Sequence, residues 1–192
     1  MTIESLEKKI LQCQLCPLAT TRTHAVPGDG NIRAEVLFIG EGPGEKEDKQ
    51  GKPFCGASGK FLDELLVSIN LSRESVFITN VVKCRPPQNR DPEESEIEIC
   101  SSHYLYNQIE MINPKIICFL GRHAMGLFMK NMKISQVHGK VFRKQNRFLI
   151  ALYHPAVALY NGSMRKVLLD DFQILNKIIN GKYTYNIVPE MI

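Results

Sequence analysis

Several features that would assign the chain to a particular class of protein are missing from its sequence. No run of about 18 apolar residues occurs, so we expect no transmembrane helix. The first residues, MTIESLEKKILQC, carry charge throughout and contain no apolar signal region, which favours a cytoplasmic protein. Internal repeats, low-complexity tracts and coiled-coil patterns are also absent, and a monomer is therefore favoured.

Length and charge allow several functions. With 192 residues, of which 44% are hydrophobic, the chain suits one domain over residues 1–192 with a sizeable core. The net charge of +4 is compatible with binding to nucleic acid, but many soluble enzymes carry as much charge. Function has to be inferred from individual residues.

Hydrophobic patterning predicts an α/β fold. Four short runs are rich in β-branched or aromatic residues and apolar on both faces, as buried parallel strands are: 35–40, 75–82, 115–121 and 147–155. Helical patterns lie around them, at about 3–12, 61–69, 122–131 and 163–180, with another helix opening at Asp91 as N-cap. This alternation predicts a three-layer sandwich with a central four-stranded parallel sheet flanked by helices.

Polar residues follow each predicted strand. Glu41 and a glycine-rich loop come after the first strand, Asn80 lies near the end of the second, Gly121-Arg122-His123 follows the third, and His154 follows the fourth. Each residue alone is more often a cap or surface residue. Because ligands bind beyond the carboxyl ends of parallel strands, their convergence favours a functional site.

The glycine-rich loop, GEGPGEKEDKQGKPFCG (40–56), is predicted to form neither helix nor strand. It lacks the G-K-[ST] ending of the Walker pattern and does not have G-x-G-x-x-G spacing. Its acidic residues would also repel phosphate. Nucleotide hydrolysis is therefore disfavoured.

The six cysteines point to a metal site, because thiols in the cytosol are kept reduced. Cys13 and Cys16 form a C-x-x-C pair, and Cys84 and Cys100 form a second pair 16 residues apart. Four thiolates of this spacing fit either zinc or a [4Fe–4S] cluster, and a structural role is favoured. Cys118, inside an apolar run, is interpreted as a core residue.

Several of these motifs together resemble the family 4 uracil-DNA glycosylases, the iron–sulfur group typical of archaea and thermophilic bacteria. The likeness rests on GEGPGEKEDKQGKPFCGASG, TNVVKCRPPQNR, YHPA and the four cysteines, in the same order, and covers nearly the whole chain. It implies excision of uracil from single- or double-stranded DNA, and a [4Fe–4S] cluster on Cys13, Cys16, Cys84 and Cys100.

The resemblance also implies how the base is bound. Such an enzyme flips uracil into a pocket, where Phe54 would stack on it and Asn80 would read its pairing edge. Backbone groups of Glu41, Gly42 and Pro43 would hold a uracil carbonyl.

Catalytic roles follow from the same resemblance. His154 would face uracil O2 and stabilise the negative charge that develops there. Glu47 would lie near C5 and help exclude the methyl group of thymine. Gly42 stands where the best-known uracil glycosylases have an aspartate, which implies a dissociative path. Glu41, Glu47 and Asp48 are candidates for a weak base or for stabilising the sugar cation.

DNA contacts are expected mainly with phosphates, from Lys83, Arg85 and Arg90. Leu159 or Tyr160 would wedge into the gap left by the flipped base. Here HPAVALYNG departs from the family's usual pattern, with Tyr160 in place of an arginine and Gly162 in place of a proline. The sequence indicates neither a preference between DNA strands nor a contact with a sliding clamp.

Two other functions fit parts of the sequence. A related protein class traps DNA covalently through a histidine-bearing insert, but KCRPPQNRDPEE contains no histidine and no extra length. A non-enzymatic iron–sulfur or zinc module that binds DNA would need the basic stretches, but not Phe54, Asn80 and His154 around one sheet edge.

Overall fold

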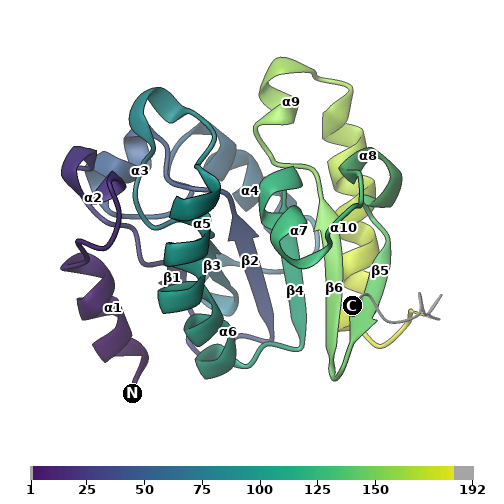
Figure 1. The fold of residues 1–192 in the computed structure, drawn as a ribbon. Helices are drawn as coiled ribbons and strands as arrows, with labels where there is room; N and C mark the ends of the chain where they lie inside the picture. The colour runs from purple at the N-terminus through teal and green to yellow at the C-terminus, as the bar shows by residue number, and fades with distance from the viewer. Residues whose placement is uncertain (1, 184–192) are drawn as a thin grey trace.

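The computed structural model describes residues 2–183 and contains a six-stranded sheet (Figure 1). The strand order is β1-β3-β2-β4-β6-β5. The strands are β1 (Asp29–Gly30), β2 (Val36–Gly40), β3 (Phe77–Asn80), β4 (Ile116–Leu120), β5 (Val141–Lys144) and β6 (Arg147–Leu152).

The four predicted parallel strands are confirmed, but the sheet is larger than predicted. Strands β3, β2, β4 and β6 pair in parallel, and every residue of β2, β3 and β4 is buried. The prediction of only four strands is wrong, because β1 and β5 add an antiparallel strand at each edge. Strand β1 has two residues and half of β5 is exposed, so neither has the long apolar pattern of a buried strand.

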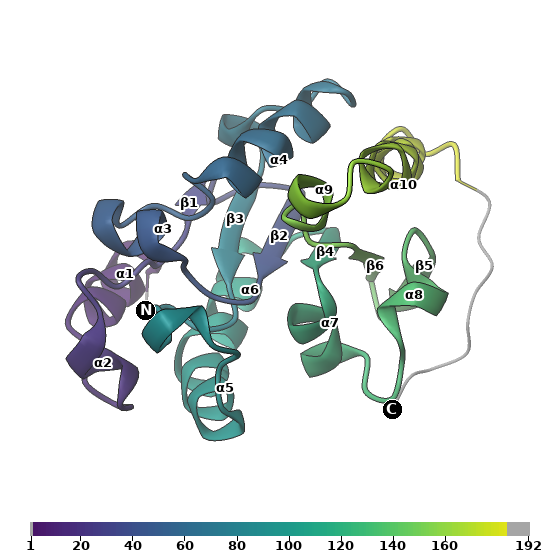
Figure 2. The ribbon, with the colours of Figure 1, turned by 90° about the horizontal axis from the view of Figure 1, so that it is seen from above.

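Helices cover both faces of the sheet, as Figure 2 shows from above. Helices α1, α5, α6 and α7 pack on one face, and α4 and α10 on the other, so each face has its own hydrophobic core. The helices are α1 (Ile3–Leu11), α2 (Leu18–Thr21), α3 (Glu45–Gln50), α4 (Ala57–Val67), α5 (Glu94–Cys100), α6 (Tyr106–Ile112), α7 (Arg122–Phe128), α8 (Ile134–Val137), α9 (Val157–Tyr160) and α10 (Met164–Ile179).

Two local predictions are wrong. The glycine-rich loop contains the helix α3, which begins after Gly44 and ends at Gly51, whose φ of 69° is the left-handed conformation common after a helix. The helix expected to open at Asp91 begins at Glu94 instead, with Glu93 as its N-cap. Asp91 is thereby free to contact residues of α7.

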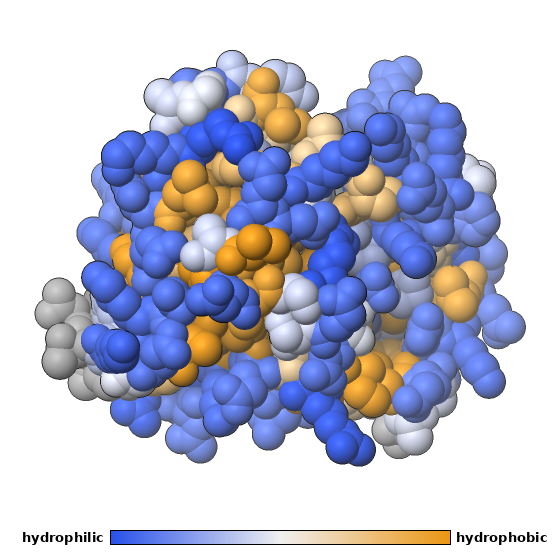
Figure 3. All heavy atoms as spheres, turned by 180° about the vertical axis from the view of Figure 1, so that it is seen from behind, coloured by the Kyte–Doolittle hydropathy of each residue, from blue (hydrophilic) through white to orange (hydrophobic). Residues whose placement is uncertain are grey.

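The face opposite to that of Figure 1 carries hydrophobic side chains near its middle, surrounded by hydrophilic ones (Figure 3). The α4 and α10 helices that cover this side of the sheet expose Val67 and Leu169. Within residues 2–183, no helix combines the length and the apolar character needed to cross a membrane.

Candidate active site

A cavity of about 530 Å³ lies beyond the carboxyl ends of the parallel strands. Parallel sheets bind ligands at this edge, because loops and helix N-termini meet there. The cavity brings together all the residues predicted to bind the base and two of those predicted to contact DNA: Glu41, Gly42, Pro43, Glu47, Phe54, Asn80, His154, Arg90 and Tyr160.

Asn80 supplies a polar group to the deepest part of the site. It ends β3 beside Gly40 of β2, and its side chain is buried. Among the described residues, its Oδ1 is the one buried side-chain nitrogen or oxygen without a hydrogen-bond partner. Such a group costs about 1–3 kcal/mol. This cost is removed when a ligand with an N–H donor enters the cavity.

Phe54 forms an aromatic wall of the cavity. Its ring lies 5.4 Å from the His154 ring, at an interplanar angle of 28°. Its φ of 49° is left-handed, which costs a bulky residue on the order of 1–3 kcal/mol. A side chain at Gly40 would have its Cβ 2.8 Å from the Phe54 ring, so glycine is needed there. The ring is thus held over the end of β2.

The two buried acidic residues of α3 have different roles. Glu47 lines the cavity, and its Oε1 accepts a hydrogen bond of 2.8 Å from the backbone N–H of Gly56. Asp48 accepts hydrogen bonds from the backbone N–H groups of Thr23 and His24. Its carboxylate is therefore turned to the N-terminal segment, and Asp48 is not among the residues that line the cavity.

His154 enters the cavity just after β6. Its Nδ1 lies 3.1 Å from the backbone N–H of Ala156 and accepts this hydrogen bond, so a neutral ring carries its proton on Nε2. Burial lowers the pKa of His154 to about 4, against the opposing effect of the Glu47 charge. At neutral pH the ring is therefore an uncharged hydrogen-bond donor.

Glu41 belongs to a charged group at the rim. Burial raises the pKa of Glu41, and this effect outweighs the opposing effects of His123 and Arg122. The His123 Nε2 lies 3.7 Å from Glu41 Oε2 and 3.2 Å from Asp91 Oδ2, and Arg122 binds the same Asp91 oxygen at 3.0 Å. Ligand atoms of Glu41, Asp91 and His123 lie within 4.8 Å of one another, close enough for a metal ion. Arg122 already neutralises Asp91, which disfavours a cation.

The four predicted metal-binding cysteines gather on the other side of β3. Cys13 and Cys16 follow α1, Cys84 follows β3, and Cys100 ends α5, and all four contact one hydrophobic core. Burial raises the thiol pKa of Cys16, Cys84 and Cys100, to about 11 for Cys100, and the neighbouring cysteine charges add to this effect. Each of these three thiols is therefore within electrostatic range of other cysteines of the set.

Three of these sulfurs also accept hydrogen bonds from nitrogen. The backbone N–H of Leu15 donates to Cys13, and the backbone N–H of Lys83 donates to Cys100. The Nη1 of Arg22 lies 3.0 Å from the Cys84 sulfur. Donors of this kind stabilise thiolate sulfur around a metal centre. The donor set thus fits a site with four thiolate ligands. Arg22 was not predicted, because it lies outside every recognisable motif.

Comparison with known proteins assigns the family. The model of the uracil DNA glycosylase superfamily matches residues 27–176. A type-4 uracil-DNA glycosylase of Sulfurisphaera tokodaii is 45% identical to the chain, with 97% of this chain and 89% of the relative covered. The chain belongs to the type-4 uracil-DNA glycosylase family. Relatives of the same description from Saccharolobus solfataricus and Archaeoglobus fulgidus are 49% and 44% identical, over 94% of this chain and 88% and 95% of theirs.

Of the two arginines predicted to contact DNA, Arg90 lines the cavity and Arg85 binds a lining residue. Arg90 lines the cavity and makes a double ion pair with Glu96, at 2.7 and 2.9 Å. The Nε of Arg85 donates to Asn89, which lines the cavity as well.

The predicted wedge residues lie on α9. Tyr160 lines the cavity and is 91% exposed, whereas Leu159 is 47% exposed. Tyr160 thus offers the larger free surface beside the cavity.

The structure contradicts the predicted DNA contact of Lys83. The sequence predicted a phosphate contact, but the side chain is buried and its Nζ donates to Thr79 Oγ1 and to the Asn80 carbonyl oxygen, at 2.8 and 2.6 Å. Burial lowers its pKa to about 8. Lys83 therefore supports the backbone of Asn80 and does not reach a DNA surface.

Proposed function

We propose that this protein excises uracil from DNA by hydrolysing the bond between the base and the sugar, which leaves an abasic site. The observation that carries the proposal is the unpaired Oδ1 of Asn80, buried beside Phe54 and His154 in one cavity. A base has to leave the helical stack to reach such a cavity.

Uracil fits the polar groups of the cavity. With uracil stacked on Phe54, the Asn80 Oδ1 would accept the hydrogen bond from N3–H, while its amide would donate to O4. Cytosine presents an acceptor at N3 and a donor at N4, so it would leave buried groups unpaired and be rejected. Glu47 would lie against the C5 edge and exclude the methyl group of thymine. The backbone of Glu41, Gly42 and Pro43 would hold a carbonyl of the base.

The chemical step would use His154 as a neutral donor. As the glycosidic bond breaks, negative charge grows on uracil O2 and positive charge grows on the sugar. The Nε2–H of His154 would donate to O2 and lower the barrier, because a donor placed where charge develops stabilises the transition state. The carboxylates of Glu41 and Glu47 line the same cavity and would stabilise the cation before water attacks it.

Cys13, Cys16, Cys84 and Cys100 would hold a [4Fe–4S] cluster. The bound cluster would supply four metal–thiolate bonds that join three chain segments. It would take no part in the excision. Lys83 donates its backbone N–H to Cys100 and its Nζ to the Asn80 carbonyl. Lys83 would thereby connect the backbone of Asn80 to a cysteine that holds the cluster.

DNA binding would involve the outer rim of the cavity. Arg85 and Arg90 would contact phosphates, and Tyr160, with Leu159 beside it, would fill the gap left by the flipped base. We further propose that residues 1–192 act as one domain, as a monomer and in the cytoplasm.

A labelled oligonucleotide with one uracil tests the proposal. We expect anaerobically purified protein to form abasic sites with many turnovers, and oligonucleotides with cytosine or thymine at that position to stay intact. Tight DNA binding without product would show a binding module instead. A single turnover followed by a covalent adduct would show a trap.

A further inference from the structure

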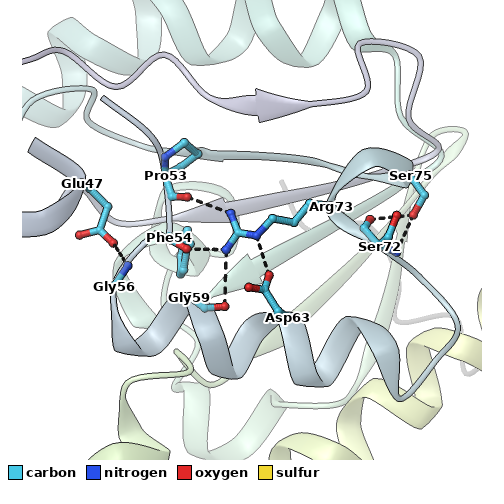
Figure 4. A network of polar contacts seen from close by, with 9 residues as sticks. All are labelled: Glu47, Pro53, Phe54, Gly56, Gly59, Asp63, Ser72, Arg73 and Ser75. Carbon is cyan, nitrogen blue, oxygen red and sulfur yellow. Dashed lines mark hydrogen bonds and ion pairs between the residues drawn. The ribbon is translucent and has the colours of Figure 1, made fainter. Parts of the chain in front are cut away.

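Phe54 is held from behind by a residue that does not line the cavity. Arg73 approaches the loop from the short 3₁₀ turn Arg73–Ser75, as Figure 4 shows. Its guanidinium donates to the carbonyl oxygens of Pro53, at 3.1 Å, and of Phe54, at a very short distance. It thus binds two consecutive peptide groups at the point where the backbone turns left-handed.

The same guanidinium is itself fixed to α4. Its Nε lies 2.5 Å from Asp63 Oδ1, and its Nη2 lies 3.5 Å from the Gly59 carbonyl oxygen, one helical turn earlier (Figure 4). At Gly59 a side chain would have its Cβ 1.7 Å from the Phe54 oxygen, so glycine lets the loop lie directly against the helix. Arg73 therefore joins the loop, the start of α4 and the segment before β3.

The turn that carries Arg73 is also well ordered by its own contacts. Ser72 and Ser75 form a reciprocal capping box, with hydrogen bonds of 3.0 and 2.8 Å between Ser75 Oγ and the Ser72 backbone. The Arg73 side chain is 25% exposed, so its bonds to the loop are partly shielded from water. A lysine could not replace these bonds, because only a guanidinium presents several donors in a fixed planar arrangement.

We propose that Arg73, fixed by Asp63, is a positioning residue that sets the Phe54 ring at the angle and height needed to stack on the flipped base. The proposal rests on the proposed function, because it assigns a role to Phe54 in base binding. Arg73 touches neither base nor sugar in this arrangement, and acts only through the Phe54 backbone.

The first test compares Arg73→Lys with Arg165→Lys in the excision assay. Arg165 is a matched control, because it pairs with Glu64 of the same helix at 2.6 Å and lies over the Phe61 ring, but does not contact the loop. We expect Arg73→Lys to lower kcat/KM by about 10- to 100-fold, as a misplaced binding group does. Arg165→Lys should leave it within about twofold of the wild type. Equal effects of the two changes would overturn the proposal.

A double-mutant cycle separates positioning from general damage. If Arg73 acts through Phe54, Arg73→Lys should cause little further loss in a protein that already carries Phe54→Leu. A loss as large as in the wild-type background would show that Arg73 acts by another route. Asp63→Asn keeps the carbonyl contacts but removes the ion pair, so it should cause a smaller loss that Phe54→Leu also abolishes. If Arg73→Lys does not fold, Asp63→Asn still allows the coupling to Phe54 to be measured.

Amide hydrogen exchange tests the proposal without the reaction. Exchange over residues 51–60 should be faster in Arg73→Lys than in the wild type, and unchanged in Arg165→Lys. If the wild type does not excise uracil, the proposed function fails while this measurement still reports on the loop. If the wild type is active and exchange over 51–60 is the same in both variants, the positioning role is refuted.

Discussion

Replacing Asn80 with alanine should separate activity from stability. In the free protein the Asn80 Oδ1 is buried without a partner, which costs about 1–3 kcal/mol. Alanine removes that cost, but it also removes the packing of the rest of the side chain, which is worth a similar amount. The two effects oppose each other. The free energy of unfolding should therefore change by no more than about 1 kcal/mol.

Excision should change much more than stability. Asn80 would make its hydrogen bonds to uracil from a buried side chain, and the base becomes negatively charged as the bond breaks. Losing such a contact costs about 2–4 kcal/mol in the transition state. That corresponds to a fall of roughly 30- to 1000-fold in kcat/KM.

The assay combines single-turnover excision on a uracil oligonucleotide with thermal unfolding of the same preparations. Asn107→Ala is the control, because Asn107 lies on α6 and its side chain donates only to the His103 carbonyl among the contacts described. A mutant Asn80→Ala that excises at the wild-type rate would refute the role of the unpaired oxygen. A loss of excision that only accompanies a fall in unfolding temperature of more than about 5 °C would refute it too.

Three further predictions concern other parts of the protein. Burial lowers the pKa of His154 from its ordinary value of 6.5 to about 4 in the folded protein. Between these two pH values His154 is therefore protonated in the unfolded chain but neutral in the folded one. Stability contributed by this group should therefore be lost as pH falls from 6.5 towards 4, and a pH–rate profile should show no His154 midpoint near 6.5. Cys84→Ser should remove iron from the purified protein and lower its unfolding temperature, whereas Cys55→Ser should keep the iron; equal iron contents would exclude Cys84 as a ligand. Tyr160→Ala should weaken binding to single-stranded DNA by roughly 5- to 150-fold in a titration, because a stacked base is lost, and an unchanged Kd would exclude stacking on Tyr160.

The sequence predicted the parts of the fold that depend on long apolar patterns. The four buried strands and the residues after them were found, because burial on both faces leaves a continuous hydrophobic run and because parallel strands bring their carboxyl ends together. Helix α3 was missed because glycines flank it, and these glycines serve as its caps instead of marking an irregular loop. Strand β1 was missed because two residues carry no pattern.

Individual contacts were harder to predict than elements. Lys83 follows a strand beside other basic residues, but the chain turns inward there and its Nζ is bound to Thr79 and Asn80. Arg73 lies 19 residues from Phe54 in a segment without a motif, and only the folded chain places it behind the loop. The roles of the base-binding residues were predicted from the resemblance to a known family. Their residue types alone would not have indicated these roles, because they occur in many turns and caps.

The two antiparallel edges of the sheet also bear on how the protein behaves at high concentration. An exposed strand edge can pair with another chain and start aggregation, and short or charged edge strands prevent this. Here one edge is the two-residue β1, and the other is β5, which ends in the exposed residues Arg143 and Lys144. The central parallel strands, whose apolar runs would aggregate most readily, are thereby kept away from the edges.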